Sequence, residues 1–225
     1  MSQTRLLVLA SSSPRRKELL ALGGWSFNIE PAEIDETPFL AEEPRHFVQR
    51  MAESKAYTVA VRQSVDCYVV AADTIVVDTL DNKEQILGKP ADAAMATDML
   101  LQLRGHYHIV YTAIAVMQIS NSLLLTDLCA TQVPMRNYTD QEVQAYINTG
   151  DPLDKAGAYA IQHEQFNPVQ NLRGCYANVV GLPLCHLTRT LIKAGVQPEA
   201  DVPGSCQAVL HYACPVFNQV LSGDY

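Results

Sequence analysis

Residues 6–22 read LLVLASSSPRRKELLAL, and the predicted fold starts from this stretch. The apolar run Leu6–Ala10 predicts a short buried strand. Ser13 followed by Pro14 is typical of a helix N-cap and first helical position, and we expect the helix to end near Leu22, before two glycines. A strand, a hydroxyl-rich turn and a helix therefore follow one another directly.

The first turn of this helix carries an unusual charge. Arg15, Arg16 and Lys17 lie where the helix dipole already favours anions, so each cation costs about 0.3–1 kcal/mol. A polyanion bound by these side chains, by backbone N–H groups and by hydroxyls such as that of Ser11 would offset that cost. The alternative is a basic helix start that faces only solvent.

Composition limits the classes of partner. The chain has 225 residues, 48% of them hydrophobic, which is enough for a large core, and a formal net charge of −8. An acidic protein is a poor match for nucleic acid or an anionic membrane, so we expect neither as a partner. Because the sequence shows neither a signal peptide nor a membrane span, we expect the protein in the cytoplasm.

The cysteines form no CxxC pair, and we expect them to be buried, reduced thiols. Their positions are Cys67, Cys129, Cys175, Cys185, Cys206 and Cys214. A metal site made by Cys206, His211 and Cys214 is an alternative, although its spacing matches no familiar zinc pattern.

Asp73 interrupts the most apolar stretch of the chain, CYVVAADTIVV at residues 67–77. A carboxylate there is costly to bury unless it is paired, protonated or bound to a metal. Asp73 is therefore a candidate for chemistry. The alternative is an aspartate that caps the end of a strand.

Two lysines are candidates for binding an anion. Residues 44–61 predict an amphipathic helix, and Lys55 lies at the margin of its apolar stripe, where it either reaches solvent or points into a polar cleft. Lys89 lies between Gly88 and Pro90, in a corner of restricted backbone.

An acidic loop lies between two prolines at residues 31–38. Its carboxylates, Glu33, Asp35 and Glu36, are the ligand type that a hard divalent cation needs. Carboxylates in a loop are also often only solvated, and the loop alone does not decide between the two.

Periodicity and turn residues predict the other elements. We expect strands at 26–30, 106–119, 123–135 and 169–176, helices at 92–105, 139–150 and 183–194, and a polar hairpin tip at 78–85. Met95 and Met99 are predicted to be core residues, His106 and His108 structural ones. Thr139 and Glu142 match a capping box. Residues 198–225 differ in composition, and we expect them to pack as an appendage on the body or on a partner chain.

Several common catalytic motifs are absent from the sequence. It contains neither GxGxxG nor GxxxxGK[ST], which excludes the common dinucleotide and P-loop sites. It also lacks GxSxG, so acyl transfer by a nucleophile elbow is not expected.

The motifs that remain resemble the Maf family of nucleoside triphosphate pyrophosphatases. The resemblance covers about residues 5–195, and the tail lies outside it. The matching segments are LASSSPRRKELL at 9–20, EIDET at 33–37, AESKA at 52–56, AADTIVV at 71–77, ILGKPAD at 86–92, GDPLDKAGAYAIQ at 150–162 and VVGLPL at 179–184.

This resemblance implies an α/β fold like that of the inosine triphosphate pyrophosphatases, with an elongated mixed sheet, flanking helices and a deep cleft between two lobes. We expect a Maf-like domain at 1–197, an appendage at 198–225, and a homodimer. The implied reaction splits a nucleoside triphosphate into the monophosphate and pyrophosphate, with Mg²⁺ or Mn²⁺.

The resemblance also implies roles for individual residues. Asp73 would be the catalytic proton acceptor and, with Glu36, would hold the metal. The phosphate site would be lined by Ser11, Arg16, Lys55 and Lys89.

Three positions divide the family by substrate, and here they are Arg15, Thr74 and Gln162. This combination resembles the branch that acts on dTTP and UTP. Ala160 is a departure, since the family often has glycine there, and its methyl group could narrow the base pocket. Two alternatives stay open: a pyrophosphatase for purine nucleotides such as ITP, and a nucleotide-binding regulator of cell division without turnover.

Overall fold

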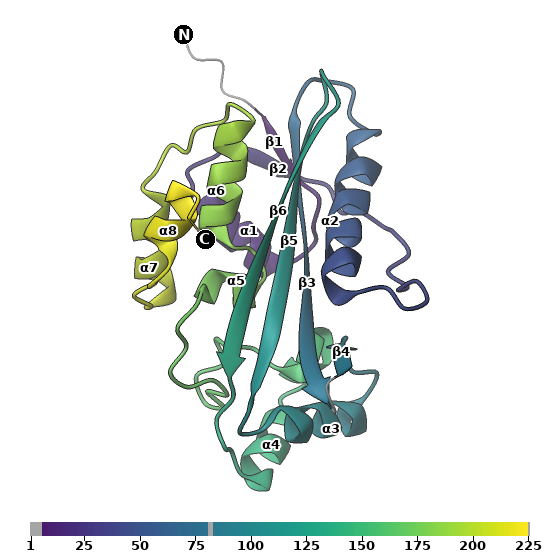
Figure 1. Ribbon diagram of the computed structural model, residues 1–225, viewed down its shortest axis with the longest axis vertical. Coiled ribbons are helices and arrows are strands. Elements are labelled where there is room, and N and C mark those ends of the chain that lie inside the picture. Colours follow the sequence, from purple (N-terminus) through teal and green to yellow (C-terminus); the bar gives the residue numbers. More distant parts are fainter. Residues whose placement is uncertain (1–5, 81–82, 225) are drawn as a thin grey trace.

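A computed structural model describes residues 6–80 and 83–224 and has a mixed α/β architecture (Figure 1). Within these residues the sheet has the order β2-β1-β3-β5-β6, and β4 pairs with β3. The strands are β1 (Leu7–Leu9), β2 (Phe27–Ile29), β3 (Tyr68–Leu80), β4 (Lys83–Leu87), β5 (Tyr107–Gln118) and β6 (Leu123–Pro134). Strand β1 is parallel to β2 and β3, whereas the other pairs are antiparallel. The predicted elongated mixed sheet is confirmed.

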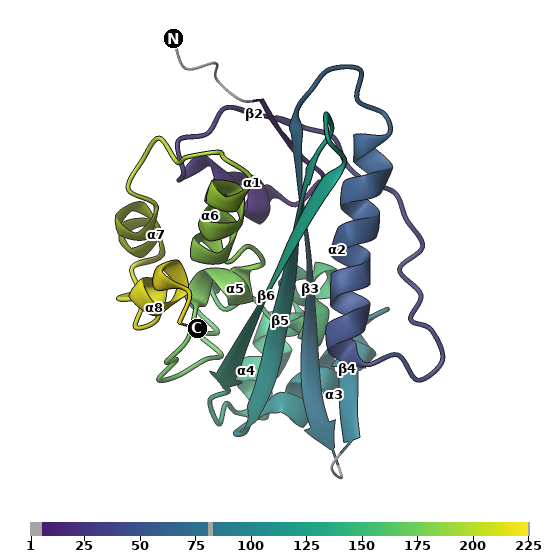
Figure 2. The same cartoon turned by 45° about the horizontal axis from the view of Figure 1, so that its top comes forward.

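Helices cover both faces of the sheet (Figures 1 and 2). Helix α2 packs on one face; α1, α5 and α6 lie on the other, and α3 and α4 pack at the far end of the long strands. The helices are α1 (Pro14–Ala21), α2 (Pro44–Ala60), α3 (Ala93–Leu103), α4 (Asp140–Ile147), η1 (Asp151–Asp154), η2 (Ala156–Ala158), α5 (Tyr176–Val180), α6 (Leu184–Lys193), α7 (Val202–Leu210) and α8 (Phe217–Ser222). No described helix is long and apolar enough to cross a membrane.

Strand β3 connects the hydrophobic clusters because its side chains alternate between the two faces. Val69 and Ala71 pack in the cluster beneath α2, while Val70 and Ala72 pack toward α6. Further along that second face, Val76 belongs to a third cluster that contains residues of α3 and α4. One long strand therefore passes through both ends of the molecule.

The sheet has a gap beside the middle of β3. Strand β1 pairs with β3 as far as Val70, and β4 begins to pair with the same edge only at Val76. Within the described part of the chain, residues 71–75 have no strand partner on that side. Both faces of this short segment, which includes Asp73, are therefore reachable from the open edge.

Many local predictions are confirmed. Ser13 caps α1 by accepting a hydrogen bond from the backbone N–H of Arg16. Thr139 and Glu142 form the predicted capping box at α4. The predicted antiparallel pair at 106–119 and 123–135 is the β5–β6 hairpin.

Other predictions are wrong. Residues 169–176 do not form a strand: Val169 makes a single bridge to Met135, and the chain then turns at Asn171, whose φ is 54°. The carbonyls of Leu172 and Gly174 instead accept hydrogen bonds from the hydroxyl of Tyr212.

The predicted hairpin tip at 78–85 is too long, because β3 continues to Leu80 and pairs with Lys83; residues 81–82 lie outside the described residues. Met99 is buried as predicted, but Met95 is 44% exposed because the buried stripe of α3 runs through Ala96, Met99 and Leu100.

The C-terminal segment forms α7 and α8, which pack on α6. Val202, Val216 and Val220 are buried in the same cluster as the sheet face under α6. Among the described cysteines, Cys206 and Cys214 are partly exposed and the others are buried, all as free thiols. Within residues 6–80 and 83–224, no group of three or more His, Cys, Asp or Glu side chains is arranged to hold a metal. The alternative metal site at Cys206, His211 and Cys214 is therefore not found there. The domain boundary at 197 stays a prediction.

Candidate active site

A cleft of about 750 Å³ opens at the gap in the sheet. Its walls come from the turn after β1, α1, the loop between β2 and α2, α2, β3, the loop after β4, η1, η2, residues 159–162 and the turn after α5. All of the predicted site residues line it: Ser11, Arg15, Arg16, Glu36, Lys55, Asp73, Thr74, Lys89 and Gln162. A second cavity, between the tail and α6, measures only about 20 Å³ and is too small for a nucleotide.

Lys55 lies between two carboxylates at the floor of this cleft. Its Nζ is 2.6 Å from Asp73 Oδ1 and 2.6 Å from Glu36 Oε1. Lys55 comes from α2 and Asp73 from the face of β3 that α2 covers, so packing of the helix on the sheet brings them together. Of the two outcomes left open for Lys55, the structure shows the one in which it points into a polar cleft.

The two carboxylates differ in protonation behaviour. Burial raises the pKa of Asp73 above its ordinary value, even though Lys55 and Arg16 act in the opposite direction. Partial burial also acts to raise the pKa of Glu36, but the hydrogen bond and charge of Lys55 outweigh it, so that pKa is lowered. Asp73 is thus the more basic group, as a general base requires, and Glu36 is the more firmly ionised one.

The guanidinium of Arg16, at the end of the Ser11–Arg16 turn, is held in a fixed orientation by hydrogen bonds. Arg16 Nε donates to the carbonyl of Gly181 at 2.9 Å, and Nη2 donates to Thr74 Oγ1 at 3.1 Å. Its Nη1 lies 3.4 Å from Ser11 Oγ, which also accepts from the backbone N–H of Ser13. Because α1 begins here, backbone N–H groups and a fixed cation occupy the same corner of the cleft, which suits an anion.

Thr74 belongs to the face of β3 opposite Asp73. Its hydroxyl is 2.9 Å from that of Thr112, which donates to the carbonyl of Asn178. Asp73 and Thr74 are adjacent in sequence and still face different walls, and the open edge of β3 lets both line one cleft.

The remaining predicted residues lie around the rim. Gln162 is exposed, and Arg15 is partly exposed, with Nη1 4.0 Å from Asp154 Oδ2. Lys89, held between Gly88 and Pro90, is also exposed, and its charge contributes to lowering the pKa of Glu36.

Sequence reasoning missed Lys155. This lysine lines the cleft, is 8% exposed, and bonds to both Asp151 and Asp154. The spacing of four residues between Asp151 and Lys155 is the signal that could have predicted this pair.

The donor set fits a divalent cation that shares its ligands with substrate. Glu36 and Asp73 place two carboxylates on one ammonium group, and no described cluster offers three or more protein ligands. Mg²⁺ is commonly bound by one or two carboxylates together with substrate phosphates and water. Glu36 and Asp73 would therefore supply carboxylate ligands to such a cation, and the described residues show no cluster for an all-protein cage.

The family model and the most similar sequences point to one family. The family model described as Maf-like protein matches residues 6–194. A dTTP/UTP pyrophosphatase from Dehalococcoides mccartyi (strain ATCC BAA-2266 / KCTC 15142 / 195) is 41% identical over 193 residues, 86% of this chain and 84% of that protein. Another, from Citrifermentans bemidjiense, is 45% identical over 185 residues, 82% of this chain and 93% of that protein. Among solved structures, a HAM1 protein from Coxiella burnetii matches with a TM-score of 0.46 at 14% identity, covering 97% of this chain and 95% of that one.

Proposed function

The chain belongs to the Maf family, and from this we propose that it is a nucleoside triphosphate pyrophosphatase acting on dTTP and UTP. The reaction yields the nucleoside monophosphate and pyrophosphate, and it would remove unwanted nucleotides from the pool. The relatives named for this activity align with most of the chain, and the family model covers residues 6–194, which contain every predicted site residue.

One observation carries the proposal. Lys55 joins a buried, more basic carboxylate to a firmly ionised one, inside a cleft large enough for a nucleotide. Cleavage of a phosphoanhydride needs positive charge beside the leaving pyrophosphate and a base for the attacking water, and this cleft has groups of both kinds.

In this mechanism the Ser11–Arg16 turn and Lys89 bind the phosphates. The N–H groups at the start of α1 and the guanidinium of Arg16 are fixed before substrate arrives, so little reorganisation is needed. Lys55 orients Asp73 through its 2.6 Å contact and adds a positive charge to the site.

Asp73 accepts the proton of the attacking water. Because burial raises its pKa, Asp73 holds a proton more readily than an exposed aspartate does. A divalent cation, Mg²⁺ or Mn²⁺, would be held by Glu36 and Asp73, and when bound it would neutralise charge on the phosphate oxygens.

Base selection would fall to Arg15, Thr74 and Gln162. The amide of Gln162 offers both a donor and an acceptor, the pair needed to read the edge of a base. Ala160 also lines the cleft, and its methyl group would restrict the space for the base.

The proposal includes a location and an assembly. The cytoplasm holds the nucleotide pool that such an enzyme would act on, and a homodimer is the assembly that the family resemblance implies. Light scattering coupled to size-exclusion chromatography measures the assembly directly: a mass twice that of the 24.8 kDa chain is expected, and a monomer contradicts it.

A pyrophosphate-release assay tests the function. Purified protein is assayed with dTTP, UTP, CTP, dGTP, GTP and ITP, each with Mg²⁺ and with Mn²⁺, and the products are identified as monophosphate and pyrophosphate. We expect the highest kcat/KM for dTTP and UTP. A preference for ITP contradicts the substrate assignment, and tight binding without turnover under either metal contradicts the enzyme.

A further inference from the structure

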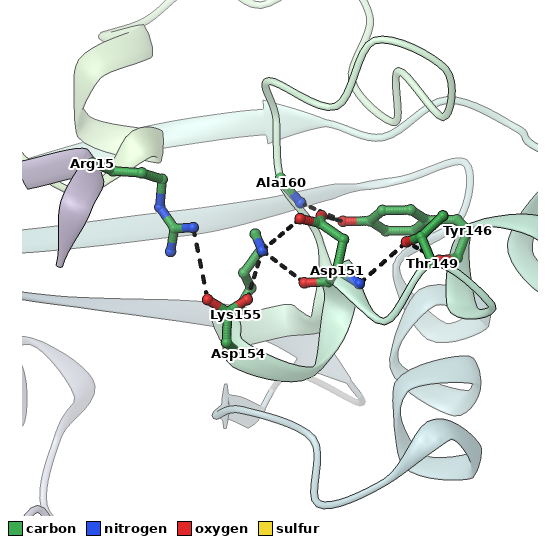
Figure 3. Close-up of polar contacts among 7 residues, drawn as sticks. All are labelled: Arg15, Tyr146, Thr149, Asp151, Asp154, Lys155 and Ala160. Carbon is green, nitrogen blue, oxygen red and sulfur yellow. Dashed lines mark hydrogen bonds and ion pairs between the residues drawn. The ribbon is translucent and has the colours of Figure 1, made fainter. Parts of the chain in front are cut away.

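A chain of polar contacts runs from α4 to α1 across the cleft (Figure 3). Its members are Tyr146, Asp151, Lys155, Asp154 and Arg15, and we name it the cross-cleft network. They come from three places: the last turn of α4, η1 with the residue that follows it, and the first turn of α1.

Lys155 is the centre of this network. Its Nζ donates to the carbonyl of Asp151 at 2.7 Å, to Asp151 Oδ1 at 2.9 Å and to Asp154 Oδ1 at 2.6 Å. An ammonium group has three N–H donors, so these acceptors use all of them. Lys155 is therefore saturated by its own segment, and it acts on a ligand through its neighbours.

At one end, Asp154 reaches toward Arg15. Lys155 holds Asp154 Oδ1, which leaves Oδ2 facing Arg15 Nη1 at 4.0 Å across the cleft. The hydrogen bond and charge of Lys155, with help from Arg15, outweigh partial burial and lower the pKa of Asp154, so this carboxylate is ionised at neutral pH. Its charge therefore faces the Arg15 side chain.

At the other end, Tyr146 holds the turn that contains Gln162. The Tyr146 hydroxyl donates to Asp151 Oδ2 at 2.6 Å and accepts from the backbone N–H of Ala160 at 2.9 Å. The turn closes through a bond from His163 N to the carbonyl of Ala160, and the His163 ring packs on Tyr146 at 4.6 Å between centroids. Gln162 lies inside this turn.

We propose that the cross-cleft network sets base selectivity by positioning Arg15 and Gln162 relative to each other, with Asp154 and Tyr146 as its positioning residues. The inference rests on the proposed function, because it assigns a role at the same cleft. The network connects Arg15 with the turn that contains Gln162, and both residues line the cleft although they are far apart in sequence. None of its described contacts involves Lys55 or Asp73. Disturbing it should change which base is preferred more than how fast the bond is cleaved.

The decisive variants are Asp154→Asn, Asp154→Glu and Tyr146→Phe. The first removes a charge from an exposed side chain, the second keeps that charge, and the third removes one buried hydroxyl. Matched controls are Asp140→Asn, which breaks an exposed aspartate–arginine pair outside the cleft, and Tyr138→Phe, which removes a buried hydroxyl in the same hydrophobic cluster.

Two readouts are needed: kcat and KM for UTP and GTP, and the dissociation constants of their non-hydrolysable α,β-methylene analogues by calorimetry. We expect Asp154→Asn and Tyr146→Phe to lower the ratio of kcat/KM for UTP to that for GTP about fivefold, through a change in KM. The ratio of the affinities for the two analogues, called the binding ratio, should fall by a similar factor. Asp154→Glu and both controls should keep both ratios within about twofold of wild type.

The results separate this inference from the proposed function. If wild-type protein releases no pyrophosphate, the proposed function fails, and the binding ratios still test the network. Unchanged ratios in both Asp154→Asn and Tyr146→Phe overturn the inference. An equal loss for both nucleotides, with a lower unfolding temperature, also overturns it, because that result indicates a structural role alone.

Discussion

Lys55 and Lys155 are two nearly buried lysines in one cleft, and each lies between two carboxylates. Lys55 is 9% exposed and Lys155 is 8% exposed. The partners of Lys155 are one and four residues away in sequence, whereas Asp73 is 18 residues from Lys55 and lies on another element. A short segment can therefore form the Lys155 cluster, while the Lys55 cluster needs α2 packed on β3.

The two lysines also differ in how many of their N–H donors are already used. Lys155 donates to three acceptors, but the described contacts of Lys55 are with two, Asp73 and Glu36. One N–H of Lys55 can therefore bind a phosphate oxygen without breaking a contact. We propose from this comparison that the saturated lysine positions its neighbours, whereas the unsaturated one takes part in the chemistry.

The largest expected effect comes from Asp73→Asn. Losing the proton acceptor should lower kcat by on the order of 10² to 10³. Burial raises the pKa of Asp73 in the folded state, so its ionised form costs stability above the ordinary pKa of aspartate, and neutral asparagine removes that cost. Pyrophosphate release and thermal unfolding at pH 7 measure both effects.

Asp98→Asn, at an exposed position of α3, is the matched control and should leave kcat unchanged. Near wild-type kcat in Asp73→Asn would remove Asp73 from the mechanism.

Replacing each lysine by methionine tests the comparison itself. Lys55→Met should lower kcat about 10²-fold, because a preorganised charge beside Asp73 is lost. Lys155→Met should keep kcat within about fivefold and lower the unfolding temperature, because Asp151 and Asp154 then repel each other without a cation between them. Steady-state kinetics and thermal unfolding of both variants measure the contrast.

Lys17→Met, at an exposed position of α1, controls for the loss of a surface lysine. Equal losses of kcat in Lys55→Met and Lys155→Met would show that the saturated and unsaturated lysines do not differ in role.

A smaller effect is expected from Thr74→Val. This change keeps the side-chain shape but removes the hydroxyl that accepts a hydrogen bond from Arg16 and contacts Thr112. With one fewer anchor for the guanidinium, KM for UTP should rise about fivefold with little change in kcat. Thr97→Val, whose hydroxyl bonds only within α3, is the control. An unchanged KM would mean that the other contacts of Arg16 suffice.

The smallest effect is a displacement of the acid limb of the pH profile. Activity requires ionised Asp73, so kcat/KM should fall with an apparent pKa above the ordinary value of 3.8 for aspartate. In Lys55→Met the limb should move to higher pH, because a cation that favours the ionised carboxylate is gone. Rates between pH 4 and 9 measure the acid limb in wild type and in Lys55→Met. A limb that moves to lower pH in the variant contradicts the assigned contact between Lys55 and Asp73.

The sequence predicts those features that depend on neighbouring residues. The N-cap at Ser13 and the capping box at Thr139 need only local hydrogen bonds, and both are confirmed. The sequence does not decide whether Lys55 reaches solvent or points into a cleft, because a residue at the margin of an apolar stripe can turn either way until α2 is packed. The helices α7 and α8 were not predicted; Val202, Val216 and Val220 are buried against α6, a contact between segments that the composition of the tail does not reveal.

The gap in the sheet could not be read from the sequence at all. It depends on where β1 stops and where β4 starts along the same edge of β3, which is a matter of register between distant segments. The cross-cleft network has the same origin, since Asp154 and Arg15 meet only after both ends of the molecule have formed.

Strand β3 runs unbroken past this gap and stays paired with β5 throughout, as β5 does with β6. The two ends of the molecule are thus joined by a continuous three-strand ribbon (Figure 2). The gap lies along its β3 edge. A widening of the cleft along this ribbon would require its paired strands to bend or twist. The stiffness of the paired strands would then set how far the cleft of the enzyme can open for its nucleotide.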